Sequence, residues 1–161
     1  YTLQVASKYP KNKIISIEAH PNEFNALKRN VIDVNNLENV TLVNMGVFSK
    51  KDELTLYEQG IWTASSSAFI KSEKQIKIKC DKLDKIIQKL VIKMDIEGSE
   101  YDALLGGIKT LENCRKIMIE VHYTDALTRK ENLDQITKIL KSNNFSLKIY
   151  EKGLRVIGIK N

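Results

Sequence analysis

Carboxylates and a histidine follow two predicted strands of this sequence, in positions where they could do acid–base or metal chemistry. Asp95 and Glu97 end one short apolar run, and Glu120 and His122 end another. Since alternate residues of a strand share a face, each pair is predicted to point to one side of a sheet. Neighbouring carboxylates raise each other's pKa or share a cation, and a histidine can take a proton from a substrate hydroxyl at neutral pH. We therefore predict that Asp95, Glu97, Glu120 and His122 are catalytic.

Two of these residues have simpler explanations that the sequence leaves open. Glu97 precedes Gly98 and a predicted helix, so its carboxylate could belong to the turn and cap backbone amides at the helix start. His122 could satisfy a hydrogen bond at the end of its strand. Asp95, Glu97 and Glu120 could also supply oxygen ligands to a divalent cation. No spacing rule demands one, so the sequence assigns no metal site.

A third acidic strand end lies near the start of the chain. The predicted strand 13–18 ends at Glu18 and is followed by a helix that Pro21 opens. A carboxylate in this position can accept hydrogen bonds from both hydroxyls of a nucleotide ribose. A solvated strand-end carboxylate is the alternative, and the glycine-rich loop that usually precedes such a strand is not in this sequence.

The central element is a strand, a turn and a helix between residues 90 and 107. A short apolar run, typical of a strand in a sheet that is covered on both faces, leads to the turn at Gly98. Apolar residues then repeat with helical spacing as far as Leu111. Gly106 and Gly107 fall inside this pattern, and we predict that they permit close packing rather than contact a ligand.

The remaining elements alternate between strands and helices and predict an α/β fold. Trp62 lies in a predicted loop, where it could be a lid over a substrate or a core anchor. The other predicted strands lie at 40–44, 53–57, 76–80, 116–122, 145–149 and 154–159, and the other predicted helices at 1–9, 21–34, 83–90 and 133–143.

Composition indicates one globular domain over residues 1–161. The chain is 42% hydrophobic, and no apolar run approaches the roughly 20 residues that span a bilayer. Cys80 and Cys114 lack metal-ligand spacing, so we predict free thiols in the cytoplasm, although a disulfide between them is left open. The net charge of +6 is densest between Lys71 and Lys93, without an arginine-rich helix or aromatic stacking residues. We interpret this segment as a solvated face and do not expect a nucleic-acid partner.

A longer motif resembles a known family. The run Lys93–Glu100, continued by Leu104–Gly107 and followed by Ile119–His122, resembles the FkbM-type S-adenosylmethionine-dependent methyltransferases. Glu18–Pro21 and Leu83-Asp84 support the resemblance, which covers almost the whole chain.

The resemblance implies a class I methyltransferase (Rossmann-like) sheet, mostly parallel, with one antiparallel C-terminal strand. It implies methyl transfer from S-adenosylmethionine to a hydroxyl of a small molecule, sugar or glycan. Glu18 with Ala19 would hold the cofactor ribose, and Asp95 would lie beside the methionine part or the acceptor. The segment Asn44–Gly46, with Asn44, Met45 and Gly46, would border the adenine. Glu97, Glu120 and His122 are assigned to the acceptor by geometry rather than by established family roles.

One part of the family pattern is not in the sequence. The first strand and its Asp-x-Gly-x-x-x-Gly loop should come immediately before Tyr1. We therefore expect an N-terminally truncated methyltransferase-like domain whose sheet lacks a strand between those ending at Glu18 and Asp95. Two alternatives are a catalytically inactive binding module with this fold and a basic domain associated with nucleic acid.

Overall fold

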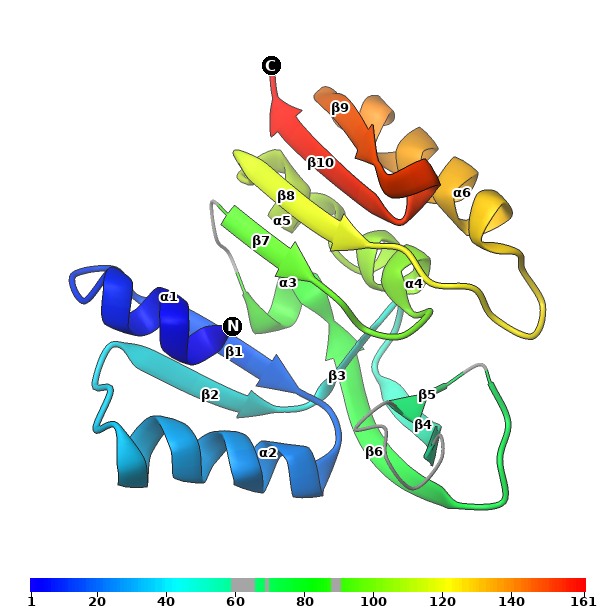
Figure 1. Ribbon diagram of the computed structural model, residues 1–161. Coiled ribbons are helices and arrows are strands. Elements are labelled where there is room, and N and C mark those ends of the chain that lie inside the picture. Colours follow the sequence, from blue (N-terminus) through cyan, green and yellow to red (C-terminus); the bar gives the residue numbers. More distant parts are fainter. Residues whose placement is uncertain (59–65, 69, 88–90) are drawn as a thin grey trace. The chain divides into compact units, whose positions relative to one another are not determined.

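A computed structural model describes residues 1–58, 66–68, 70–87 and 91–161 (Figure 1). Trp62 and Leu90 lie outside the described residues, so the two interpretations of Trp62 are not tested. The fold is a mixed α/β fold that divides into two compact units, Tyr1–Gly46 and Val47–Asn161. Each unit is described by itself, and the expectation of a single domain stays a prediction.

The first unit is built on two parallel strands. β1 pairs with β2 so that Glu18 lies opposite Asn44. Pro21 occupies the first turn of the helix that follows β1, where its missing N–H costs no hydrogen bond. The elements of this unit are α1 (Thr2–Lys8), β1 (Ile14–Glu18), α2 (Pro21–Lys28), the π-helical segment η1 (Arg29–Val34) and β2 (Val40–Asn44).

The second unit contains two four-stranded sheets, with strand orders β7-β8-β10-β9 and β3-β6-β4-β5. Its elements, counting β3 from the boundary, are β3 (Gly46–Phe48), β4 (Asp52–Glu58), β5 (Ser66–Ser67), β6 (Gln75–Lys82), α3 (Leu83–Ile86), β7 (Val91–Met94), α4 (Glu100–Leu105), α5 (Ile108–Glu112), β8 (Lys116–Glu120), α6 (Arg129–Ser142), β9 (Phe145–Tyr150), the 3-10 turn η2 (Glu151–Gly153) and β10 (Arg155–Lys160).

The first of these sheets holds the residues of chemical interest. β7 and β8 are parallel, with Met94 opposite Ile119, and β10 is antiparallel to both β8 and β9. The strands predicted at 145–149 and 154–159 are therefore confirmed, and they form an antiparallel pair. Among the described residues, β7 pairs with β8 alone and β1 with β2 alone, so each lies at an edge of its own sheet.

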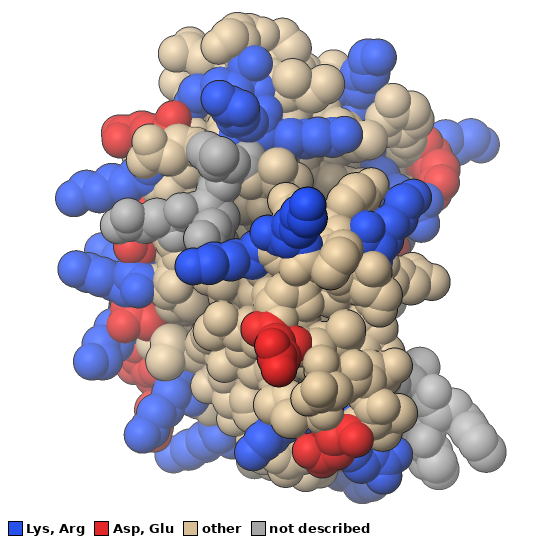
Figure 2. Space-filling view, turned by 90° about the vertical axis from the view of Figure 1, so that its left-hand side faces the viewer, with Lys and Arg blue, Asp and Glu red and all other residues tan. Residues whose placement is uncertain are grey.

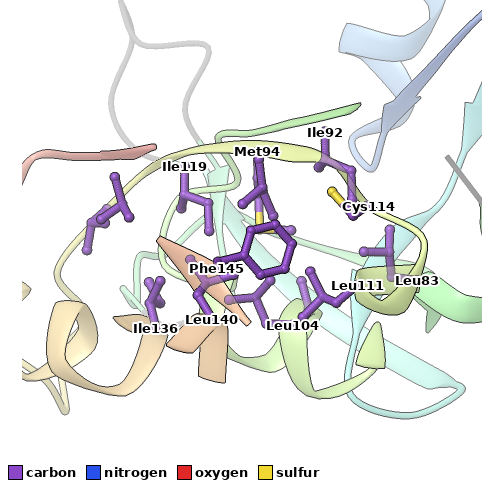
Figure 3. Close-up of a cluster of buried hydrophobic side chains, with 14 residues drawn as sticks. Leu83, Ile92, Met94, Leu104, Leu111, Cys114, Ile119, Ile136, Leu140 and Phe145 are labelled. Carbon is purple, nitrogen blue, oxygen red and sulfur yellow. The ribbon is translucent and has the colours of Figure 1, made fainter. Parts of the chain in front are cut away.

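Helices α4, α5 and α6 cover one face of this sheet and form the core with it (Figure 3). Leu104 and Leu140 from the helices pack with Met94, Ile119 and Phe145 from the strands. The prediction that β7 is covered on both faces is wrong for Val91, which is 67% exposed, because α4 and α5 pack on the face that carries Ile92 and Met94.

The single helix predicted from Ser99 to Leu111 is two helices, α4 and α5, which are separated at Gly106 and Gly107. A Cβ on Gly106 would lie 2.2 Å from the carbonyl oxygen of Phe48, and one on Gly107 would lie 2.8 Å from a methyl of Leu83. Both glycines therefore allow close packing, as predicted.

Three other expectations have outcomes in the structure. Cys80 and Cys114 are buried free thiols, so the disulfide alternative is wrong. Among the described residues, no helix has the length and apolar character needed to cross a membrane. The described lysines from Lys71 to Lys93 are exposed, as predicted for a solvated face. Figure 2 shows one face of the molecule, on which basic side chains are interspersed with acidic and uncharged ones.

Candidate functional site

Two parallel strands bring the predicted catalytic residues to one edge of a sheet. β7 ends at Met94 and β8 ends at Glu120, and the chain leaves both strands in the same direction. After β7 the backbone turns sharply, with positive φ at Glu97 (53°) and Gly98 (99°). Glycine adopts this conformation easily, whereas a residue such as Glu97 does so uncommonly. The turn directs the chain into α4.

Asp95, Glu97 and His122 lie together at this edge. Nε2 of His122 is 3.7 Å from Oδ1 of Asp95 and 3.7 Å from Oε2 of Glu97. One ligand atom of each residue lies within 4.8 Å of the other two. Oxygen and nitrogen atoms at this spacing could surround one metal ion or one acidic proton. The structure thus brings together three of the four residues that were predicted to be catalytic.

Glu120, the fourth residue, has a different partner. Its Oε2 lies 3.6 Å from Nε of Arg155 on β10, the strand beside β8. Arg155 also donates a hydrogen bond to Glu151. Glu120 is not one of the residues whose ligand atoms gather around His122. Its predicted role in catalysis therefore stays a prediction, with an ion pair as its observed contact.

Glu100 is the most important residue that the sequence reasoning missed. Its side chain is fully buried at the start of α4. Oε1 accepts hydrogen bonds from Nδ1 of His122 at 2.8 Å and from the backbone N–H of Gly98 at 3.1 Å. Because the carboxylate accepts this hydrogen bond, Nδ1 of His122 carries the proton. The other ring nitrogen, Nε2, lies toward Asp95 and Glu97.

Asn132 on α6 completes this buried arrangement. Its Nδ2 donates to Oε2 of Glu100 at 3.3 Å and to the backbone oxygen of His122 at 2.9 Å. The N-terminus of helix α6 is stabilised by a reciprocal capping box between Thr128 and Glu131.

Little in the sequence pointed to Glu100 or Asn132. Glu100 lies inside the motif quoted above, but charged residues at helix starts are usually exposed. Asn132 is far along the chain and gave no local signal.

The surroundings of His122 raise the pKa of its imidazole above the usual value. Burial by itself lowers this pKa because it penalises the charged form. The hydrogen bond and negative charge of Glu100, followed by the charges of Glu97 and Asp95, outweigh burial. The three neighbouring carboxylates therefore favour the protonated form of this imidazole.

Lys93 orients Asp95 from the other side. Its Nζ forms a short ion pair with Oδ2 of Asp95, while Oδ1 is the oxygen that faces His122. Lys93 lies on β7 and Asp95 directly follows its end. Glu97 lies in the turn with a positive φ, so the prediction that Asp95 and Glu97 share the face of one continuous strand is wrong, because β7 ends at Met94. The carboxylate of Asp95 therefore has one oxygen engaged and one directed to the cluster.

In the first unit, the residues predicted to bind the cofactor meet at the ends of β1 and β2. Nδ2 of Asn44 donates to the backbone oxygens of Glu18 at 2.8 Å and Ala19 at 3.2 Å. The N–H of Met45 also donates to the Glu18 oxygen, at 3.2 Å. Oε1 of Glu18 accepts a hydrogen bond from the backbone N–H of His20 at 2.8 Å. Gly46, the last residue of this unit, is buried.

Comparison with known proteins agrees with this architecture. A family model described as the methyltransferase FkbM domain matches residues 2–147. A crystal structure of methyltransferase FkbM from Methylobacillus flagellatus KT is similar, with a TM-score of 0.60 and 19% identity. The match covers 92% of this chain and 36% of that one, so this chain spans about a third of the length of that protein. No protein with a curated description matches. The family match extends over most of the sequence, and the chain therefore belongs to the FkbM methyltransferase domain family.

Proposed function

We propose that the protein transfers a methyl group from S-adenosylmethionine to a hydroxyl oxygen of a small molecule, sugar or glycan. The observation that supports this most directly is the Asp95–Glu97–His122 cluster at the carboxyl ends of β7 and β8, in a chain of a methyltransferase family. Ligands of open α/β sheets bind at such strand ends. The carboxylates and the imidazole are the groups that an acceptor hydroxyl needs for orientation and loss of its proton.

The strand orders support a class I, Rossmann-like sheet. Such a sheet is mostly parallel, with an antiparallel strand among its last members. In this chain β7 and β8 are parallel, and antiparallel β10 lies between β8 and β9. β1 and β2 form a second parallel pair. Each of these sheets, taken by itself, thus contains a parallel pair of the kind that a class I sheet has.

Glu18 is the proposed ribose ligand. Oε1 of Glu18 already accepts from His20, which fixes the carboxylate at the end of β1. An ionised carboxylate can accept several hydrogen bonds, so the group has capacity for ribose hydroxyls. Asn44 and Met45, which hold the backbone beside it, are the proposed adenine border together with Gly46. These donors and acceptors suit a nucleoside.

S-adenosylmethionine, when bound, supplies an electrophilic methyl group on a sulfonium ion. The chain's own part is to align the acceptor oxygen for in-line attack, which can lower a barrier by roughly 7–11 kcal/mol in favourable cases. Asp95, Glu97 and His122 would orient the hydroxyl and receive its proton as the oxygen–carbon bond forms and the sulfur–methyl bond breaks, which would leave the thioether S-adenosylhomocysteine. Of these, Glu97 combines a half-exposed carboxylate with a position beside Nε2 of His122.

Calorimetry with the full-length protein tests the cofactor part of the proposal. We expect saturable binding of S-adenosylmethionine that Glu18→Ala weakens by roughly 10- to 100-fold, the equivalent of hydrogen bonds to a charged group. Glu23→Ala, a change in the first turn of α2, is the matched control and should leave the affinity unchanged. Absence of binding by the full-length protein would overturn the enzyme assignment and favour an inactive binding module.

A further inference from the structure

We propose that Asp95, Glu97 and His122 bind a divalent first-row transition metal ion such as Mn²⁺ or Zn²⁺. The ion would lie between Oδ1 of Asp95, Oε2 of Glu97 and Nε2 of His122. The cluster is the one to which the proposed function assigns the acceptor, but binding of the ion requires neither cofactor nor methyl transfer. The proposal is therefore testable by itself.

The distances within the cluster favour a shared ion over direct hydrogen bonds. Nε2 of His122 is 3.7 Å from each carboxylate oxygen, which is longer than the 2.7–3.2 Å of ordinary N–H···O hydrogen bonds. Two ligands of one tetrahedral zinc ion, each about 2.0–2.2 Å from the metal, are about 3.3–3.5 Å apart. A shift of a few tenths of an ångström in each partly exposed carboxylate side chain would bring its oxygen to that separation from Nε2 of His122.

The donor set selects the class of metal. Imidazole nitrogen binds zinc, manganese, iron and related ions, whereas Mg²⁺ and Ca²⁺ are held by oxygen ligands alone in most proteins. One imidazole with two carboxylates is a three-ligand set, like those of catalytic zinc sites. Such a site keeps a position for water or substrate. An acceptor hydroxyl bound there would lose its proton more easily than in water.

A second layer of contacts outside the cluster resembles that of metal-binding histidines. In metal sites, the histidine nitrogen that does not bind the metal usually donates to a carboxylate, which fixes the ring and its tautomer. Here Nδ1 of His122 donates to Glu100, a carboxylate with no solvent exposure, and Asn132 holds Glu100 in turn. Lys93 plays the corresponding part for Asp95 by binding Oδ2 and leaving Oδ1 toward the cluster. These contacts direct two of the three proposed ligand atoms to the same point.

The sign of the charge at the cluster also suits a cation. Three carboxylates, those of Asp95, Glu97 and Glu100, lie around His122. Opposite charges in a partly buried site attract strongly because water screens them little.

Manganese binding to the full-length protein, treated with chelator and without S-adenosylmethionine, tests the proposal. Electron paramagnetic resonance of free Mn²⁺ measures the affinity and stoichiometry of Mn²⁺ binding. Competition by Zn²⁺ measures the affinity for Zn²⁺. We expect one ion per chain. Glu97→Gln and His122→Ala should each weaken binding by about 100-fold or more, because loss of a second-layer contact alone costs 10- to 100-fold. Glu100→Gln should weaken binding within that smaller range.

Asp134→Asn is the matched control, since it removes an exposed carboxylate of α6 that pairs with Lys130. It should leave metal affinity unchanged. Circular dichroism of the metal-free variants checks that each is folded, and Glu97→Gln, with a half-exposed side chain, keeps the test informative if His122→Ala unfolds. Absence of stoichiometric binding, or binding that Glu97→Gln and His122→Ala leave unchanged, would overturn the metal site. Either result leaves the cofactor calorimetry unaffected, so the two proposals can fail separately.

Discussion

Nδ1 of His122 lies 2.8 Å from Oε1 of Glu100, and the Glu100 side chain has no solvent exposure. An ionised carboxylate in such a position is costly unless its oxygens are hydrogen-bonded. Gly98, His122 and Asn132 supply these bonds from three different segments. Glu100 therefore joins the turn after β7, the end of β8 and helix α6. The conformation of His122 depends on it.

The first prediction concerns Glu100→Gln, which should lower the pKa of His122. The variant removes the largest contributions that raise this pKa, whereas burial, which lowers it, remains. NMR titration of the imidazole in chelator-treated protein measures the change. The chain has two histidines, so the spectrum of His122→Ala assigns the signal. An unchanged pKa would show that Glu100 does not act on His122.

The same pKa shift gives a dependence of stability on pH. A histidine whose pKa is raised by folding contributes stability that is fully present below the pKa of the unfolded chain and is lost as pH rises through the folded pKa. In metal-free protein, the wild type should therefore lose stability relative to Glu100→Gln as pH rises through this range. Urea unfolding across the range measures it.

The second prediction concerns Asn132→Leu, which should destabilise the second unit. The change leaves Oε2 of Glu100 and the carbonyl of His122 without the N–H donor of Asn132. A buried acceptor that loses its partner costs about 1–3 kcal/mol, and more when it is charged. Urea unfolding measures the loss. Asp134→Asn, an exposed change on the same helix, is the control and should unfold like the wild type.

The third prediction compares two adjacent glycines. Gly106→Ala should destabilise by about 1–3 kcal/mol, because its Cβ would meet a backbone carbonyl at 2.2 Å. Gly107→Ala should cost less, because its nearest neighbour is a methyl of Leu83, which can move. Thermal unfolding of both variants tests the order. The reverse order would mean that the backbone at Phe48 moves more easily than the Leu83 side chain.

Local patterns predicted much of this structure. The alternation at 145–149 and 154–159 led to β9 and β10, and Pro21 marked the start of α2. The strand ends placed Asp95 and His122 together because two parallel strands deliver their ends to one edge, whereas Glu97 joins them through the turn after β7. These features depend on residues close in sequence, or on a rule of sheet geometry that holds for any parallel pair.

Local sequence patterns could not predict the contacts between distant segments. Glu120 and His122 shared one pattern, but Arg155, 35 positions beyond Glu120, pairs with Glu120. The contact between Asn132 and Glu100 depends on the packing of α6 against α4. The division between α4 and α5 likewise depends on Phe48 and Leu83, which no helical periodicity contains. Tertiary packing decided each of these outcomes over the local pattern.

The last prediction is that Cys80 and Cys114 react slowly with iodoacetamide while the protein is folded. Burial raises the pKa of both thiols. The thiolate is the reacting species, so a raised pKa and low exposure both slow alkylation. Pulsed alkylation followed by mass spectrometry should show little modification of native protein and rapid modification in denaturant. Because an unfolded chain ionises its thiols at lower pH, stability should also fall as pH rises past the ordinary thiol pKa of about 8.5. The variants Cys80→Ala and Cys114→Ala separate the two sites, and alkylation of either native thiol at the denatured rate would contradict its burial.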